Sequence, residues 1–151
     1  MISQLVRAIA IAGATLGGLG LLALLACTNA ARRETSSLAA AVDRYRHASA
    51  TEDKESLASA VSSVGCTDAR VCDAKQACVA AIDPTTRALA LKDEVTRRLA
   101  DIEQKRLASD SPEAQALPAK LDEAERLLRE GRTHMAACDA KLATLQVATG
   151  G

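Results

Sequence analysis

The stretch that decides the fold is residues 118–147, PAKLDEAERLLREGRTHMAACDAKLATLQV. Small or apolar residues recur in it at alternating steps of three and four, namely Leu121, Ala124, Leu128, Gly131, Met135, Cys138, Leu142 and Leu145. This heptad spacing is typical of a helix that presents one seam to a partner helix. It predicts a helix over residues 118–147, and Gly131 on the seam permits a close approach of the two backbones.

A first partner helix is expected upstream, over residues 37–64. Its apolar stripe includes Leu38, Val42 and Tyr45, at spacings of four and three. Such spacing puts these side chains on one face of a helix. The stripe weakens around residues 49–53, which leaves room for a break or a bend there.

A second partner helix is expected over residues 69–108. Thr67 or Asp68 can cap its N-terminus. Pro84 allows two interpretations, either one kinked helix or two segments that meet at the proline. The apolar face of this stretch is expected to consist of Leu91, Val95, Leu99 and Ile102.

The composition favours the same fold class. Ala, Leu, Lys, Arg and Glu are abundant and rank high in helix propensity, whereas the chain has one Tyr, no Phe and no Trp. No run alternates β-branched or aromatic residues as a strand would. We therefore expect an all-α protein, an antiparallel helical hairpin or three-helix bundle with coiled-coil-like packing. The bundle should occupy residues 37–147, and residues 148–151 should fray.

The N-terminal residues form a separate unit. A basic residue precedes an unbroken apolar run over residues 8–26, which is expected to be a hydrophobic signal helix. The run ends with Leu24, Ala26 and Cys27 in a spacing that resembles the lipobox of bacterial lipoproteins. That motif has Leu three positions before the cysteine and a small residue just before it, whereas Leu25 is bulkier than the usual residue at its position.

The resemblance implies removal of residues 1–26 and lipidation of Cys27, which would anchor the protein in a bacterial cell envelope, facing the periplasm or the exterior. Thr28, rather than the Asp associated with inner-membrane retention, favours the outer membrane where the host has one. Residues 27–36 are expected to form a polar tether. An uncleaved transmembrane helix and a cleaved soluble protein stay open as alternatives, and all three place residues 28–151 outside the cytoplasm.

Four cysteines follow Cys27, namely Cys66, Cys72, Cys78 and Cys138. In a non-cytosolic compartment they favour two disulfides, which would support a core of Ala and Leu that buries only a small area. Cys72 and Cys78 lie about 9 Å apart along one helix, which is too far for a bond. Cys66 therefore pairs with Cys72 or Cys78, and the other reaches Cys138. A turn near residue 110 favours Cys66–Cys72 and Cys78–Cys138.

No sequence motif points to catalysis or to a cofactor. The cysteine spacing matches a zinc site poorly, and the chain lacks a GxSxG elbow, a P-loop and a dinucleotide fingerprint. His47 and His134 are expected to be solvated surface residues without a metal. The 19 basic and 19 acidic residues are interspersed, so no basic stripe indicates a nucleic-acid partner.

The mature chain also resembles an uncharacterised class of small helical bacterial lipoproteins with a C-x5-C-x5-C cluster and a later lone cysteine. That resemblance implies a helical fold and no known activity. Our first hypothesis is a lipid-anchored, non-enzymatic structural or interaction module that docks an envelope protein through an amphipathic helix. The alternatives are a binding protein for a small apolar or lipid ligand, held between helices by Leu and Val, and an enzyme that uses a cluster of His47, His134 and carboxylates.

Overall fold

The computed structural model describes residues 15–49 and 51–150, with side chains from Ala30 onward except that of Glu52. Its helices are α2 (Thr15–His47), α3 (Thr51–Ser62), α4 (Ala69–Glu103), α5 (Pro112–Gln115) and α6 (Leu117–Thr149). The described residues contain no strand, so the predicted all-α class is confirmed. Residues 1–14 of the predicted signal segment lie outside the described residues, and residues 15–26 are the start of α2. None of the helices in the described ranges combines the length and hydropathy needed to cross a membrane.

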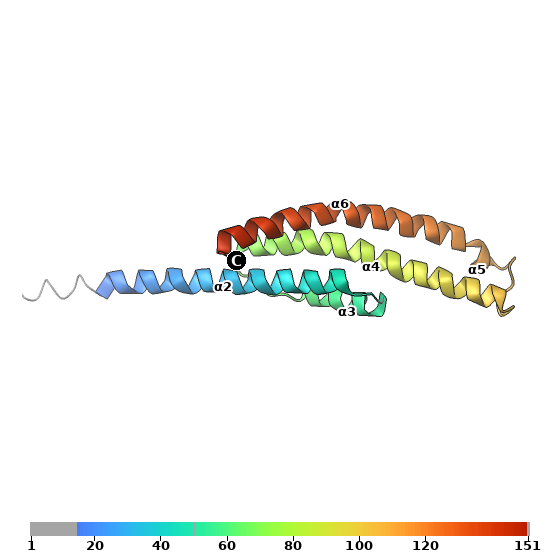
Figure 1. Ribbon diagram of the computed structural model, residues 1–151, viewed down its shortest axis with the longest axis horizontal. Coiled ribbons are helices and arrows are strands. Elements are labelled where there is room, and N and C mark those ends of the chain that lie inside the picture. Colours follow the sequence, from blue (N-terminus) through green and yellow to red (C-terminus); the bar gives the residue numbers. More distant parts are fainter. Residues whose placement is uncertain (1–14, 50, 151) are drawn as a thin grey trace, which may run out of the picture.

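The frame of the molecule is a long antiparallel hairpin of α4 and α6, as predicted (Figure 1). The two helices have 35 and 33 residues, and they are connected at one end through α5. α2 lies alongside the half of the hairpin that contains the start of α4 and the end of α6 (Figure 1). α3 folds back along α2, so it runs antiparallel to both α2 and α4 (Figure 1).

The buried side chains form two clusters along this hairpin. The larger cluster lies where α2 and α3 cover α4 and α6, and we call that part the base. Its buried members include Leu38, Val42, Tyr45, Val61, Val71, Ala74, Cys78, Ile82, Cys138, Leu142 and Leu145. The rest of the hairpin, residues 88–128, extends beyond the end of α2, and we call it the arm (Figure 1). Its core is Ala88, Ala124 and Leu127, with Leu91 and Leu128 packed against them.

The predicted helix over residues 37–64 is two helices, α2 and α3, which meet close to residues 49–53, where the sequence leaves room for a break. The chain reverses where the apolar stripe weakens, and the reversal brings Val61 (0% exposed) into the core of the base. Lys54 fastens the turn, since its Nζ donates to the Tyr45 carbonyl at 2.7 Å and lies 4.5 Å from the centre of the Tyr45 ring. The base therefore packs four helices rather than three.

The predicted tether over residues 27–36 is also helical and belongs to α2. Ala31 and Thr35 are only 6% and 2% exposed, and the Thr35 hydroxyl donates to the Ala31 carbonyl at 2.8 Å. α6 likewise continues past the predicted fraying point, and the Arg32 guanidinium donates to the Gly150 carbonyl at 2.9 Å. The two ends of the folded domain therefore lie together.

The stretch predicted over residues 69–108 is one helix that passes through Pro84 and ends earlier than expected. Proline lacks the amide hydrogen that would continue the backbone bonding. The next residue, Thr85, adds a side-chain hydrogen bond, since its hydroxyl donates to the Ala81 carbonyl at 2.8 Å. Beyond the helix, Lys105 adopts a left-handed conformation, with a φ of 56°.

Gly131 packs against this turn of α4. A Cβ atom at position 131 would lie 2.2 Å from the Thr85 Oγ1 atom and 3.0 Å from the Ala81 carbonyl oxygen. The close approach predicted for Gly131 is therefore confirmed, and it depends on the absence of a side chain.

The predicted seam of α6 is right in the base and partly wrong in the arm. Cys138, Leu142 and Leu145 are buried as expected. In the arm Leu127, which the seam omits, is 1% exposed, whereas Leu121 is 40% exposed. A straight helix drifts by about 20° per heptad relative to an ideal 3.5-residue repeat, so a stripe drawn at fixed heptad steps leaves the contact. Leu99 on α4, also predicted to face the core, is 48% exposed.

Candidate functional site

Two disulfides staple the base. Cys78 and Cys138 join α4 to α6 with 4.6 Å between their Cα atoms, and both side chains are fully buried. Cys66 and Cys72 close the loop that leads into α4, with 5.2 Å between their Cα atoms. These are the pairs that the sequence favours. Cysteines in disulfides have no thiolate with which to bind a metal ion.

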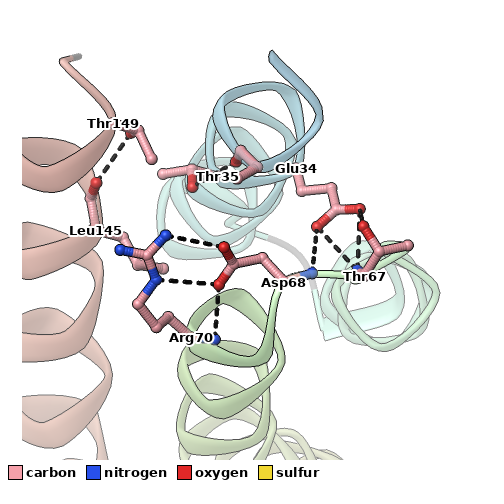
Figure 2. A network of polar contacts seen from close by, with 8 residues as sticks. Glu34, Thr35, Thr67, Asp68, Arg70, Leu145 and Thr149 are labelled. Atoms are coloured by element: carbon pink, nitrogen blue, oxygen red, sulfur yellow. Dashed lines mark hydrogen bonds and ion pairs between the residues drawn. The ribbon is translucent and has the colours of Figure 1, made fainter. Parts of the chain in front are cut away.

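The carboxylate of Glu34 on α2 holds the loop that the shorter disulfide closes (Figure 2). It accepts hydrogen bonds from the Thr67 amide at 2.9 Å, the Thr67 hydroxyl at 2.7 Å and the Asp68 amide at 3.3 Å. The bond from the Thr67 amide contributes most to lowering the pKa of Glu34 below its ordinary value. The sequence analysis misses this contact, because the partners lie more than 30 residues from Glu34 along the chain.

Asp68 caps α4, and it is one of the two candidates, Thr67 and Asp68, that the sequence allows. Its side chain accepts from the Arg70 amide at 2.8 Å and pairs with the Arg70 guanidinium at 2.8 Å (Figure 2). The hydrogen bonds from the Arg70 side chain, and then from its amide, lower the pKa of Asp68 to about 2. We call Glu34, Thr67, Asp68 and Arg70 the collar, because they tie α2 to the start of α4.

The predicted lipidation site, Cys27, lies in α2 four residues before the buried Ala31. The structure describes its backbone position and not its side chain, so lipidation stays a prediction. α2 continues through this position without interruption, from Thr15 to His47.

The two histidines are both exposed. His47 Nδ1 lies 2.9 Å from the Asp43 carbonyl oxygen and 3.4 Å from a carboxylate oxygen of Asp43. In the part of the chain that the structure describes, no three His, Cys, Asp or Glu side chains gather closely enough to hold a metal ion.

A groove of about 460 Å³ lies between α2 and α6 in the base. Val42 and Leu142 line it, but both are buried within the core. Asp43, Arg46 and Asp139 also line it, and Arg46 and Asp139 form an ion pair. The lining is divided between five apolar residues and four polar or charged ones, so it is less apolar than the usual site for a lipid or small apolar ligand.

A second groove, of about 330 Å³, lies on the arm, and we call it the arm groove. Its apolar lining comes from α6, where Leu121 is exposed, Leu128 is half-buried and Ala124 is buried. Its charged lining consists of Lys92 from α4 and Glu125, Arg129 and Arg132 from α6.

No family model, curated protein or solved structure matches this chain. Its functional interpretation therefore rests on its own geometry. That geometry comprises a disulfide-stapled helical base, a collar that fixes α2, and an arm with a partly apolar groove.

Proposed function

We propose that this protein is a lipid-anchored protein of the bacterial cell envelope, in which the stapled base holds the arm at a fixed distance from the membrane as a non-enzymatic interaction module. The lipobox-like spacing of Leu24, Ala26 and Cys27 supports the anchor, and one structural observation supports the fixed orientation, namely that α2 runs unbroken through Cys27 and into the base. A lipid on Cys27 would therefore connect to the domain through a helix rather than through a flexible tether.

The distance between the anchor and the base supports a fixed orientation. Ala31 is already buried, and the four residues from Cys27 to Ala31 rise by only about 6 Å in a helix. The collar then fixes the direction of α2, since Glu34 bonds to the loop before α4. The base would sit close to the membrane surface and point the arm away from it.

The length of the hairpin supports a role at a distance from the membrane surface. α4 has 35 residues, which corresponds to about 50 Å at the rise of an α-helix. Because α4 begins in the base and ends near the far end of the arm (Figure 1), the arm would stand well clear of the lipid headgroups. Such a shape suits a spacer that presents a surface to another envelope protein.

The contacts of the carboxylates support a role without catalysis. Glu34, Asp68 and Glu94 have lowered pKa values. Each has a structural partner that explains the shift, namely Thr67, Arg70 and Lys120 respectively. A perturbed pKa that a capping bond or an inter-helix ion pair explains does not indicate a catalytic group.

The intact mass of the protein, purified from its own host membrane, tests the anchor. We expect the mass of residues 27–151 plus acyl groups, and a gain of four hydrogens on reduction of the two disulfides. A Cys27→Ser variant should lose the acyl mass. It should either leave the membrane fraction in the mature form or retain its signal segment. A full-length mass for the natural protein, or a cleaved mass without acyl groups, would overturn the proposal of lipid anchoring.

A further inference from the structure

The arm groove continues the surface that α2 covers in the base. At the end of α2 the Arg46 guanidinium donates to the Met135 sulfur at 3.3 Å and pairs with Asp139 on α6. Moving outward along α6, Leu128 and Leu121 follow Met135 at steps of seven residues. Over these two steps the position around a straight helix drifts by only about 40°. The face of α6 that α2 contacts in the base therefore continues into the arm, where α2 no longer covers it (Figure 1).

The apolar residues of the arm groove are more exposed than those of the base, as expected where no third helix covers the hairpin. In the base, the α2 residues Leu38, Val42 and Tyr45 pack against the hairpin, and all three are at most 2% exposed. In the arm groove Leu121 is 40% exposed and Leu128 is half-buried. The stripe on α2 shows which kind of element fits this surface, namely a helix with apolar side chains at steps of four and three.

The charges of the arm groove define the partner further. Three cations, Lys92, Arg129 and Arg132, line it with one anion, Glu125. Arg129 pairs with Glu125 at 3.7 Å, whereas Lys92 and Arg132 form no ion pair among the described residues. The groove therefore combines apolar side chains with positive charge that its one anion does not balance.

We propose that the arm groove binds an amphipathic α-helix of another protein, one whose apolar stripe is flanked by Asp or Glu. This inference rests on the proposed function, because it names the partner that the interaction module would take. A second copy presenting the same groove would bring Lys92 and Arg132 close to their counterparts, and like charges that face each other oppose binding.

Two designed helical peptides test the recognition directly. They share one Leu and Ala stripe, and they differ only in carrying Glu or Lys at the flanking positions. Binding is measured by fluorescence anisotropy at low salt, with the full chain purified in mild detergent, whether or not it carries acyl groups. We expect the Glu peptide to bind at least tenfold more tightly than the Lys peptide, and high salt to reduce the difference.

Variants assign the binding to the groove. Lys92→Glu with Arg132→Glu should reverse the preference to the Lys peptide, and Leu121→Ser should weaken binding of the Glu peptide at least threefold. Leu121 is exposed, so its replacement should leave the fold intact, which circular dichroism checks. Arg44→Glu, on the exposed side of α2, is the matched control and should leave both affinities unchanged.

Three outcomes would overturn the inference. They are equal affinity for the two peptides, no binding of either, or a preference that survives the Lys92 and Arg132 substitutions. Sedimentation gives a separate check, since a dimer that Leu121→Glu dissociates would make a second copy the occupant. None of these results depends on acylation, so they are distinguishable from a failure of the lipid anchor, which the intact mass reports.

Discussion

The base and the arm are built on the same two helices but are held together in different ways. In the base, α2 and α3 cover the hairpin, and both disulfides lie there. In the arm, two helices meet over Ala88, Ala124 and Leu127, supported by the ion pair of Glu94 with Lys120. The comparison shows how this hairpin, whose core is rich in Ala, is stabilised. Disulfides and two further helices stabilise the base, whereas the arm leaves apolar surface exposed. Regions with few buried contacts open most readily, so the arm should be the less stable part.

The largest expected effect comes from removing the buried disulfide. Cys78→Ala with Cys138→Ala opens a link between residues 60 apart in sequence, and the chain-entropy estimate is a loss of about 4 kcal/mol in the free energy of unfolding. Cys66→Ala with Cys72→Ala opens a link of six residues and should cost about 2 kcal/mol. Urea unfolding of both variants measures the difference. Equal losses would show that loop length does not govern the effect.

A pair of cavity variants compares the two cores directly. Leu38→Ala in the base and Leu127→Ala in the arm both remove a side chain that is at most 1% exposed. We expect losses of about 3 kcal/mol in the base and about 2 kcal/mol in the arm, where the neighbours can collapse more freely. Hydrogen exchange should show that Leu127→Ala speeds exchange in the arm alone. Faster exchange throughout the base in that variant would mean that the two parts unfold as one unit.

The contact of Gly131 with α4 gives a smaller effect. Gly131→Ala gains about 1 kcal/mol of helix propensity, but its Cβ meets Thr85 Oγ1 and the Ala81 carbonyl. Overpacking costs typically about 1–3 kcal/mol, so we expect a net loss of about 1 kcal/mol in thermal or urea unfolding. Thr85→Ala removes the nearest atom and should recover much of that loss in the double variant. A stabilised Gly131→Ala variant would contradict the close contact.

The smallest effect concerns pH and the collar. The pKa of Asp68 falls from an ordinary value of 3.8 to about 2 in the folded protein, and the pKa of Glu34 is also lowered. A lowered folded pKa adds stability above the unfolded pKa, and that contribution disappears as the pH falls through the folded value. The melting temperature should therefore drop between about pH 4 and about pH 2. In the Asp68→Asn variant the melting temperature should drop less over this range. An identical drop would show that Asp68 does not cause the pH dependence.

The fold could be predicted from sequence wherever a local pattern was sufficient. The hairpin of α4 and α6, the cap at Asp68 and the close approach at Gly131 follow from spacing and residue type. The candidate site was less predictable. The collar depends on Glu34, a single acid in a polar stretch, and the arm groove depends on Leu121, which the heptad pattern assigns to the seam.

The sequence by itself determined that this protein is helical, where its two longest helices run, and which cysteines cannot pair. These properties depend on residues within a few turns of one another, so spacing and propensity suffice. Only the tertiary structure decided that the chain reverses after α2, that Glu34 holds the loop before α4, and that Leu127 rather than Leu121 enters the core. Each of these depends on which face of a distant helix is already occupied, because a side chain is buried only where another element covers it.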